Sequence, residues 1–296
     1  MRKTLTIIGF FAVALAGAGW WITTPERVDA GDYADLIGVP ARGAVVFHAG
    51  GCASCHSAEG ASGDKKLVLS GGRAFVSDFG TFHAPNISAD PEHGIGDWSV
   101  TDLANAMIHG TSPTGQHYYP AFPYAAYSRV SPQDIADLHA YLITLPADAT
   151  PDRAHDLAFT FTLRRGLGLW KALYVTDGWQ VAGDLTEVEA RGRYLAEALG
   201  HCAECHTPRG VLGGLDRDRW MAGAPNPSGQ GTIPNITPAK LDWSEADLIA
   251  YFTSGFTPDY DTAGGSMAAV VESLAQLPDA DRAALAAYLK RLPAVE

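Results

Sequence analysis

The sequence predicts an all-α protein in which two tandem copies of one domain follow an N-terminal transmembrane helix. The first observation behind this prediction is a pentapeptide at residues 52–56, Cys-Ala-Ser-Cys-His, which returns as Cys-Ala-Glu-Cys-His at residues 202–206. The second is that the segments around these pentapeptides repeat each other in the same order. The third is an N-terminal run without charged residues, from position 4 to position 25.

The N-terminal segment, residues 1–24, is predicted to be a membrane anchor. Arg2 and Lys3 precede a charge-free run of 22 residues, which as a helix is long enough to cross a bilayer. Trp20 and Trp21 lie where an aromatic belt is expected, and the basic residues place the N-terminus in the cytoplasm. A cleaved signal peptide is the alternative, because small residues at 14–18 fit a cleavage site. We expect an exported body in either case, on the periplasmic side of a bacterial inner membrane or, after cleavage, free in the periplasm.

Residues 25–39 are polar and acidic and are predicted to form a neck before the first domain, residues 40–146. That domain begins with a short helix from Ala41, which Gly50 and Gly51 stop just before Cys52. Residues 57–97 are rich in Gly, Ser and Asp and are expected to form loops. A loop of this length in a compact domain requires something other than side chains to supply the core.

The two pentapeptides carry the chemistry. Cys-x-x-Cys-His is the signature of covalent haem c attachment, in which two thiols take up the vinyl groups and the histidine binds the iron. Zinc modules place their cysteine pairs within about 20 residues of each other, and a thioredoxin-like pair needs a βαβ setting, so both alternatives fit poorly. All four cysteines of the chain lie in the two motifs. The predicted attachment residues for two haems are Cys52, Cys55, His56, Cys202, Cys205 and His206.

Two further helices complete the first domain. Ser99 followed by Asp102 resembles a capping box, and Gly110 is expected to end the helix that starts there. The second helix starts after Ser131, with proline in its first turn, and ends at Leu145.

Residues 147–183 link this domain to the second one, residues 184–296. In the linker, residues 164–171 are basic and apolar and are expected to pack between the domains. The second domain repeats the first: Ala-Arg-Gly precedes both haem motifs, and Pro-Asn-Ile, Asp-Trp-Ser and Ala-Tyr-Leu follow both in the same order. A duplicated single-haem domain explains this order.

The charge balance excludes one class of partner. The formal net charge is −12 and the pI is near 5.2. Nucleic acid favours basic proteins, so we expect no nucleic-acid partner. An acidic surface is compatible with encounters between this protein and a basic redox partner.

Each half resembles a class I cytochrome c domain, in which a helix leads into Cys-x-x-Cys-His, loops wrap the haem and a closing helix packs on the first. From about residue 38 onward, the chain is similar to the membrane-bound di-haem and tri-haem cytochrome c subunits of bacterial periplasmic dehydrogenases of alcohols, aldehydes or sugar acids. The resemblance implies two tandem class I cytochrome c domains with two covalently bound haem c groups. It also implies a dehydrogenase as electron donor and a cytochrome, quinone-linked complex or oxidase as acceptor.

Haem iron in such carriers usually has a methionine as its second ligand, which raises the potential. The resemblance places this ligand at Met267, on the glycine-rich loop Gly264-Gly265-Ser266 of the second half. Met221, beside Trp220, is expected to be a packing residue.

The first half departs from the family pattern. Related subunits carry methionine in a Tyr-Pro-Ala-Met-Pro-Tyr loop, where this chain has Phe122. Three alternatives remain for the distal side of the first haem: His117, Met107, or an open iron with Phe122 packing over it. His117 lies 61 residues after His56, the same interval that separates Met267 from His206, so the count favours His117. A histidine ligand would lower the potential of the first haem relative to the second.

The sequence therefore predicts an electron-transfer subunit rather than a stand-alone enzyme, because redox chemistry belongs to the haems and the sequence shows no separate catalytic machinery. No catalytic side chain is predicted. The alternative is a di-haem peroxidase-like enzyme in which the first haem is open and the second feeds it electrons.

Overall fold

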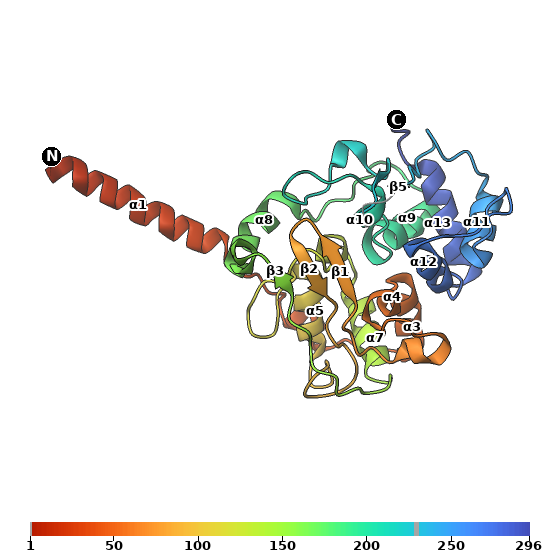
Figure 1. The fold of residues 1–296 in the computed structure, drawn as a ribbon, viewed down its shortest axis with the longest axis horizontal. Helices are drawn as coiled ribbons and strands as arrows, with labels where there is room; N and C mark the ends of the chain where they lie inside the picture. The colour runs from red at the N-terminus through yellow and green to blue at the C-terminus, as the bar shows by residue number, and fades with distance from the viewer. Residues whose placement is uncertain (1, 228–230) are drawn as a thin grey trace.

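Two helical domains form the body of the molecule, and helix α1 (Arg2–Ile22) projects from it (Figure 1). The structure, a computed structural model, describes residues 2–227 and 231–296. The helix predicted over residues 1–24 is thus present as α1. In the described part of the chain, however, no helix combines the length and the apolar character that crossing a bilayer demands, so the predicted transmembrane span is not supported.

The first domain is built on the crossing of two helices that are far apart in sequence, the helix before the haem motif and the closing helix. Gly43 lies at this crossing, where a Cβ atom would stand 1.9 Å from the carbonyl oxygen of Asp137. Only glycine permits this approach. Helix α2 (Gly31–Ala34) lies in the neck, and the helices of the domain are α3 (Pro40–Ala49), α4 (Cys52–His56), α5 (Val100–His109), α6 (Tyr124–Tyr127) and α7 (Pro132–Leu142).

The second domain repeats this crossing. A Cβ atom on Gly192 would stand 1.9 Å from the carbonyl oxygen of Ala284, so the two domains share one packing solution. The first helix continues as a π-helical segment up to the haem motif. The helices are α9 (Glu187–Arg193), the π-helix η4 (Tyr194–Leu199), α10 (Ala203–His206), α11 (Glu245–Ser254), α12 (Ser266–Leu274) and α13 (Asp279–Arg291).

The predicted helix caps are confirmed. Ser99 and Asp102 form a reciprocal capping box at the start of α5, and Gly110 ends that helix in the left-handed conformation with φ 56°. Ser244, Asp247 and Gly255 do the same for α11, where the φ of Gly255 is 79°. Matching caps therefore fix matching helices in the two halves.

The fold was predicted to be all-α; the structure is mostly helical but also includes short strands. Within residues 57–97, the 3-10 helix η1 (Gly63–Leu67) is followed by an antiparallel hairpin of β1 (Ala74–Ser77) and β2 (Gly80–His83), to which β3 (Asp156–Leu157) adds a third strand. In the second domain, β4 (Ala224–Pro225) pairs with β5 (Thr232–Ile233). Gly80, the first residue of β2, has a φ of 121°, which suits glycine.

The linker wraps the first domain and touches the second. The side-chain amide of Asn86 donates to the carbonyl oxygens of Asp148 and Thr150, which fixes the start of the linker on the loops around the first haem motif. Next come the 3-10 helices η2 (Phe159–Thr162) and η3 (Arg164–Gly166) and helix α8 (Leu167–Tyr174). Trp170 on α8 donates to the carbonyl oxygen of Leu212 in the second domain. Through Trp170, the basic, apolar stretch touches the second domain as well as the first.

Helix α8 also holds the base of α1. A Cβ atom on Gly168 would lie 2.5 Å from Cα of Thr23, so backbone packs on backbone here. The guanidinium of Arg165 lies 4.0 Å from the ring centroid of Trp20 and donates to its carbonyl oxygen at 2.6 Å. The junction between α1 and the body is thus specific.

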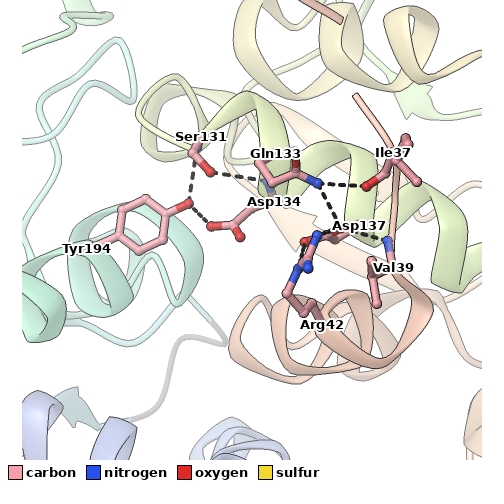
Figure 2. Close-up of polar contacts among 8 residues, drawn as sticks. All are labelled: Ile37, Val39, Arg42, Ser131, Gln133, Asp134, Asp137 and Tyr194. Carbon is pink, nitrogen blue, oxygen red and sulfur yellow. Dashed lines mark hydrogen bonds and ion pairs between the residues drawn. The ribbon is translucent and has the colours of Figure 1, made fainter. Parts of the chain in front are cut away.

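A polar contact joins the two domains at their closing and opening helices. Figure 2 shows Tyr194, from the second domain, with its hydroxyl directed at α7 of the first. The hydroxyl donates to the Asp134 carboxylate and accepts from the backbone N–H of Ser131 at 3.1 Å. Nearby in the same view, Arg42 binds the fully buried Asp137 through two hydrogen bonds of 2.6 and 2.9 Å.

Candidate haem-binding sites

Each haem motif forms a short helix that follows a left-handed residue. The residue before Cys52 is Gly51, with φ 59°, and the residue before Cys202 is His201, with φ 40°. The chain must take this conformation to turn from the long helix into the motif. Glycine adopts it freely, whereas a histidine does so at a cost of about 1 kcal/mol or more.

The two proximal histidines have the same second partner. His56 Nδ1 lies 2.9 Å from the carbonyl oxygen of Pro85, and His206 Nδ1 lies 2.8 Å from that of Pro234. An Nδ1–H that donates to a carbonyl leaves the lone pair on Nε2, the atom that binds iron. Burial lowers the pKa of both histidines, which favours the neutral, metal-binding form. Both imidazoles therefore fit the role of proximal ligand.

The cysteines are also suited to attachment. All four are free thiols in the structure. Burial raises the pKa of Cys52 and of Cys202 to about 12, so both remain protonated thiols at neutral pH. Together with the adjacent histidines, each pair fits one haem c, which supplies a single iron that stores and releases one electron.

The distal loops of the two domains align through matching hydrogen bonds. The N–H of Tyr118 donates to the Gly110 carbonyl at 2.7 Å, and the N–H of Ala263 donates to the Gly255 carbonyl at 2.8 Å. Four residues further along each loop come Phe122 and Met267. The backbone therefore places phenylalanine in the first domain where the second domain has its methionine.

This alignment corrects the argument for His117. Bridges between Thr111 and His117 and between Phe256 and Thr262 show that His117 corresponds to Thr262. The count of 61 residues misled because 54 residues separate His56 from Gly110, whereas 49 separate His206 from Gly255.

The surroundings of His117 also argue against a ligand role. Its ring is buried, with Nε2 3.0 Å from the Thr23 carbonyl oxygen and Nδ1 2.9 Å from Lys171 Nζ. Both ring nitrogens thus have partners, on the base of α1 and on α8. Burial lowers the pKa of His117 and, more strongly, that of Lys171, to about 7. The structure gives His117 the role of joining α1, α8 and the distal loop.

The methionines divide into core and loop residues. Met107 is buried in the core that α5 forms with its neighbours. Met221 is fully buried, and its backbone carbonyl accepts a hydrogen bond from the N–H of Ile236. The fully buried Leu69 makes the same bond with Ile87 in the first domain, so Met221 occupies the position of a packing residue. Met267 is half-buried in the first turn of α12. Its role as ligand of the second haem remains a prediction.

The two motifs meet at the domain interface, which the sequence did not reveal. A Cβ atom on Gly50 would lie 3.8 Å from the Leu199 carbonyl oxygen, and one on Gly200 would lie 3.6 Å from that of Ala49. Helix α6 packs on η4, and α12 packs on α3, so each distal-loop helix covers the attachment helix of the other domain. The contacts are reciprocal and bring the residues before Cys52 and Cys202 together.

Two interface residues were missed by sequence reasoning. Tyr127, on α6, is buried against His201, with ring centroids 5.7 Å apart. One signal was present in the sequence, because a non-glycine residue stands at 201 where the first domain has Gly51.

Comparison with known proteins agrees with this geometry. The cytochrome c family model matches residues 40–146 and 189–293. The chain is 59% identical to a diheme cytochrome c-type protein of Cereibacter sphaeroides, with 100% of both chains covered. With 86% of its length covered in each case, it is 38% identical to the fructose dehydrogenase cytochrome subunit of Gluconobacter japonicus and 36% identical to the gluconate 2-dehydrogenase cytochrome c subunit of Pantoea cypripedii.

The chain spans about half the length of these two dehydrogenase subunits, 52% and 59% respectively. The family model, in contrast, matches both halves of this chain, and each match contains one haem motif. The chain belongs to the cytochrome c family, as an electron-transfer protein of two cytochrome c domains with two covalently bound haem c groups.

Proposed function

We propose that this protein is the cytochrome subunit of a periplasmic dehydrogenase and relays electrons from that enzyme to a respiratory acceptor. The observation that carries the proposal is the identity of 38% and 36% with the fructose and gluconate dehydrogenase subunits over nearly all of the two-domain body. The acceptor is a second cytochrome, a quinone-linked complex or an oxidase.

The chain's own residues hold and orient the two redox centres. The carbonyl groups of Pro85 and Pro234 fix the orientation of the proximal histidines. The reciprocal contacts of Gly50 and Gly200 hold the ends of the two attachment helices against each other. A short, fixed separation between centres favours rapid exchange, which is what a relay requires.

The difference between the distal loops gives the relay a direction. Methionine ligation raises the potential of a haem iron, and Phe122 stands where the second domain has Met267. The first haem is then the more reducing of the two. Electrons enter at the first domain and leave from the second.

One observation favours a second function. Phe122 cannot bind iron, and His117 and Met107 are both engaged elsewhere, so the first haem has no evident protein ligand on its distal side among the described residues. An open iron would suit a di-haem peroxidase-like enzyme. Peroxide consumption by the isolated protein with a reduced donor would favour this enzyme over the carrier.

We further propose that the body lies on the periplasmic side of the inner membrane. Support comes from the charge-free run at the N-terminus and from the exposed side chains of Trp20 and Trp21 at the base of α1. Cell fractionation, together with mass spectrometry of the mature N-terminus, tests this. Recovery of the haem-loaded protein in the cytoplasm would refute the proposal.

Reduction by candidate partners tests the relay. The oxidised protein is mixed with purified sugar, sugar-acid or alcohol dehydrogenase and its substrate, and haem reduction is followed by absorbance. We expect reduction at a rate that keeps pace with substrate turnover, with the second haem reduced at equilibrium. Failure of all such partners to reduce the protein, combined with peroxide turnover, would replace the relay by the enzyme.

A further inference from the structure

Three aromatic rings form a continuous series from the distal loop of the first domain to the haem motif of the second. The ring centroids of Phe122 and Tyr127 are 5.5 Å apart, and those of Tyr127 and His201 are 5.7 Å apart. Both separations lie in the range of direct ring contact. Phe122 occupies the distal-ligand position of the first domain, and His201 is bonded to Cys202, an attachment residue of the second haem.

The central ring is enclosed by both motifs. Tyr127 is 7% exposed and belongs to the shared core. Burial raises the pKa of its hydroxyl well above the usual value, so the hydroxyl keeps its proton. Residues of both attachment motifs, Cys52, Cys55 and Glu204, lie near Tyr127.

The third ring is held at an energetic cost. His201 has a φ of 40°, in the left-handed region that favours glycine. The first domain has glycine at the equivalent turn. A histidine at this turn is a backbone outlier of the kind that clusters at functional sites.

We propose that Phe122, Tyr127 and His201 form the path along which electrons pass between the two haem sites. Electronic coupling declines steeply across gaps and less steeply through packed atoms, so an unbroken series of rings is the favoured route. One electron leaves the first haem, which is oxidised, and reaches the second, which is reduced; no proton or chemical group moves. The inference rests on the proposed relay, because it assumes that the two haems exchange electrons.

The test uses the full chain loaded with both haems. Tyr127→Leu removes the central ring, Tyr127→Phe keeps it, and Tyr251→Leu removes a ring of the second domain that packs on Trp243 and Phe252. One electron is injected by a light flash from an attached photosensitiser, and the approach of the two haems to equilibrium is followed. Redox titration of each variant gives the two midpoint potentials.

We expect Tyr127→Leu to slow exchange between the haems by at least one order of magnitude with both potentials unchanged, whereas Tyr127→Phe and Tyr251→Leu keep the native rate. A native rate in Tyr127→Leu would overturn the path. So would equal slowing in Tyr251→Leu, since the effect would then not belong to this series of rings.

A second variant covers the case in which Tyr127→Leu does not fold. His201→Asn removes the ring, and asparagine tolerates a positive φ, so the turn is preserved. We expect the same slowing in this variant, and a native rate would contradict the path. If the native protein itself shows no electron exchange between the haems, the relay fails. If the native protein exchanges electrons and the variants do so at the same rate, only the path fails.

Discussion

Glycine at the crossing of the first and last helices of each domain should be indispensable. Replacing it by alanine in one domain at a time tests this. In Gly192→Ala the new Cβ would meet the carbonyl oxygen of Ala284 at 1.9 Å and the Cβ of Tyr288 at 2.6 Å. The first of these is a backbone atom, so α13 must move away by about 1 Å or more. Overpacking of this kind costs about 1–3 kcal/mol, and here the upper end applies. The better helix propensity of alanine returns about 1 kcal/mol.

The net loss of about 2 kcal/mol in the free energy of unfolding corresponds to a fall of about 10 °C in the Tm of a domain of this size. Because α9 leads through η4 into Cys202, the displacement should also shift the potential of the second haem and leave the first unchanged. Thermal unfolding and redox titration measure both effects. Gly43→Ala is the mirror experiment, and Gly178→Ala, where a Cβ meets nothing within 4 Å, is the control. A native Tm in Gly192→Ala, or equal shifts of both haems, would refute the reasoning.

Three further predictions concern single side chains. His117→Ala should leave the low-temperature and room-temperature haem spectra unchanged while destabilising the junction with α1; a new high-spin signal would restore His117 as a ligand. Burial lowers the pKa of Lys171 from its ordinary value to about 7. Between about pH 7 and that ordinary value, Lys171 is therefore protonated in the unfolded chain and largely neutral in the folded protein. Stability should therefore rise with pH above about 7, and denaturant unfolding of Lys171→Met should show a smaller rise. Met267→Leu should lower the potential of the second haem and alter its spectrum; a native potential would exclude Met267 as the ligand.

The parts of the fold that depend on local chemistry could be predicted from the sequence. The haem motifs, the duplication and the capping boxes at Ser99 and Ser244 each depend on residues a few positions apart, and the structure has all of them. The hairpin at residues 74–83 was missed because its strands are only four residues long and lie in a glycine-rich segment.

The parts that depend on long-range contacts could not be predicted. Counting residues paired His117 with Met267, because the count cannot detect that the stretch between motif and distal loop is five residues longer in the first domain. The partners of His117 are Thr23, just after α1, and Lys171 on α8, both far away in sequence. The contact between Tyr127 and His201 likewise joins residues of different domains, and no local pattern encodes it.

The reciprocal packing of α6 on η4 and of α12 on α3 has the form of an isologous dimer whose two copies have become one chain. In a symmetric homodimer every substitution occurs twice, so the two iron centres would necessarily have identical surroundings and no electron would gain by crossing between them. Covalent fusion removes that constraint. One domain has Phe122 at the position where the other has Met267, and only a fused pair can differ in this way. The duplication thus allows the two haem sites of one molecule to differ in their distal residues.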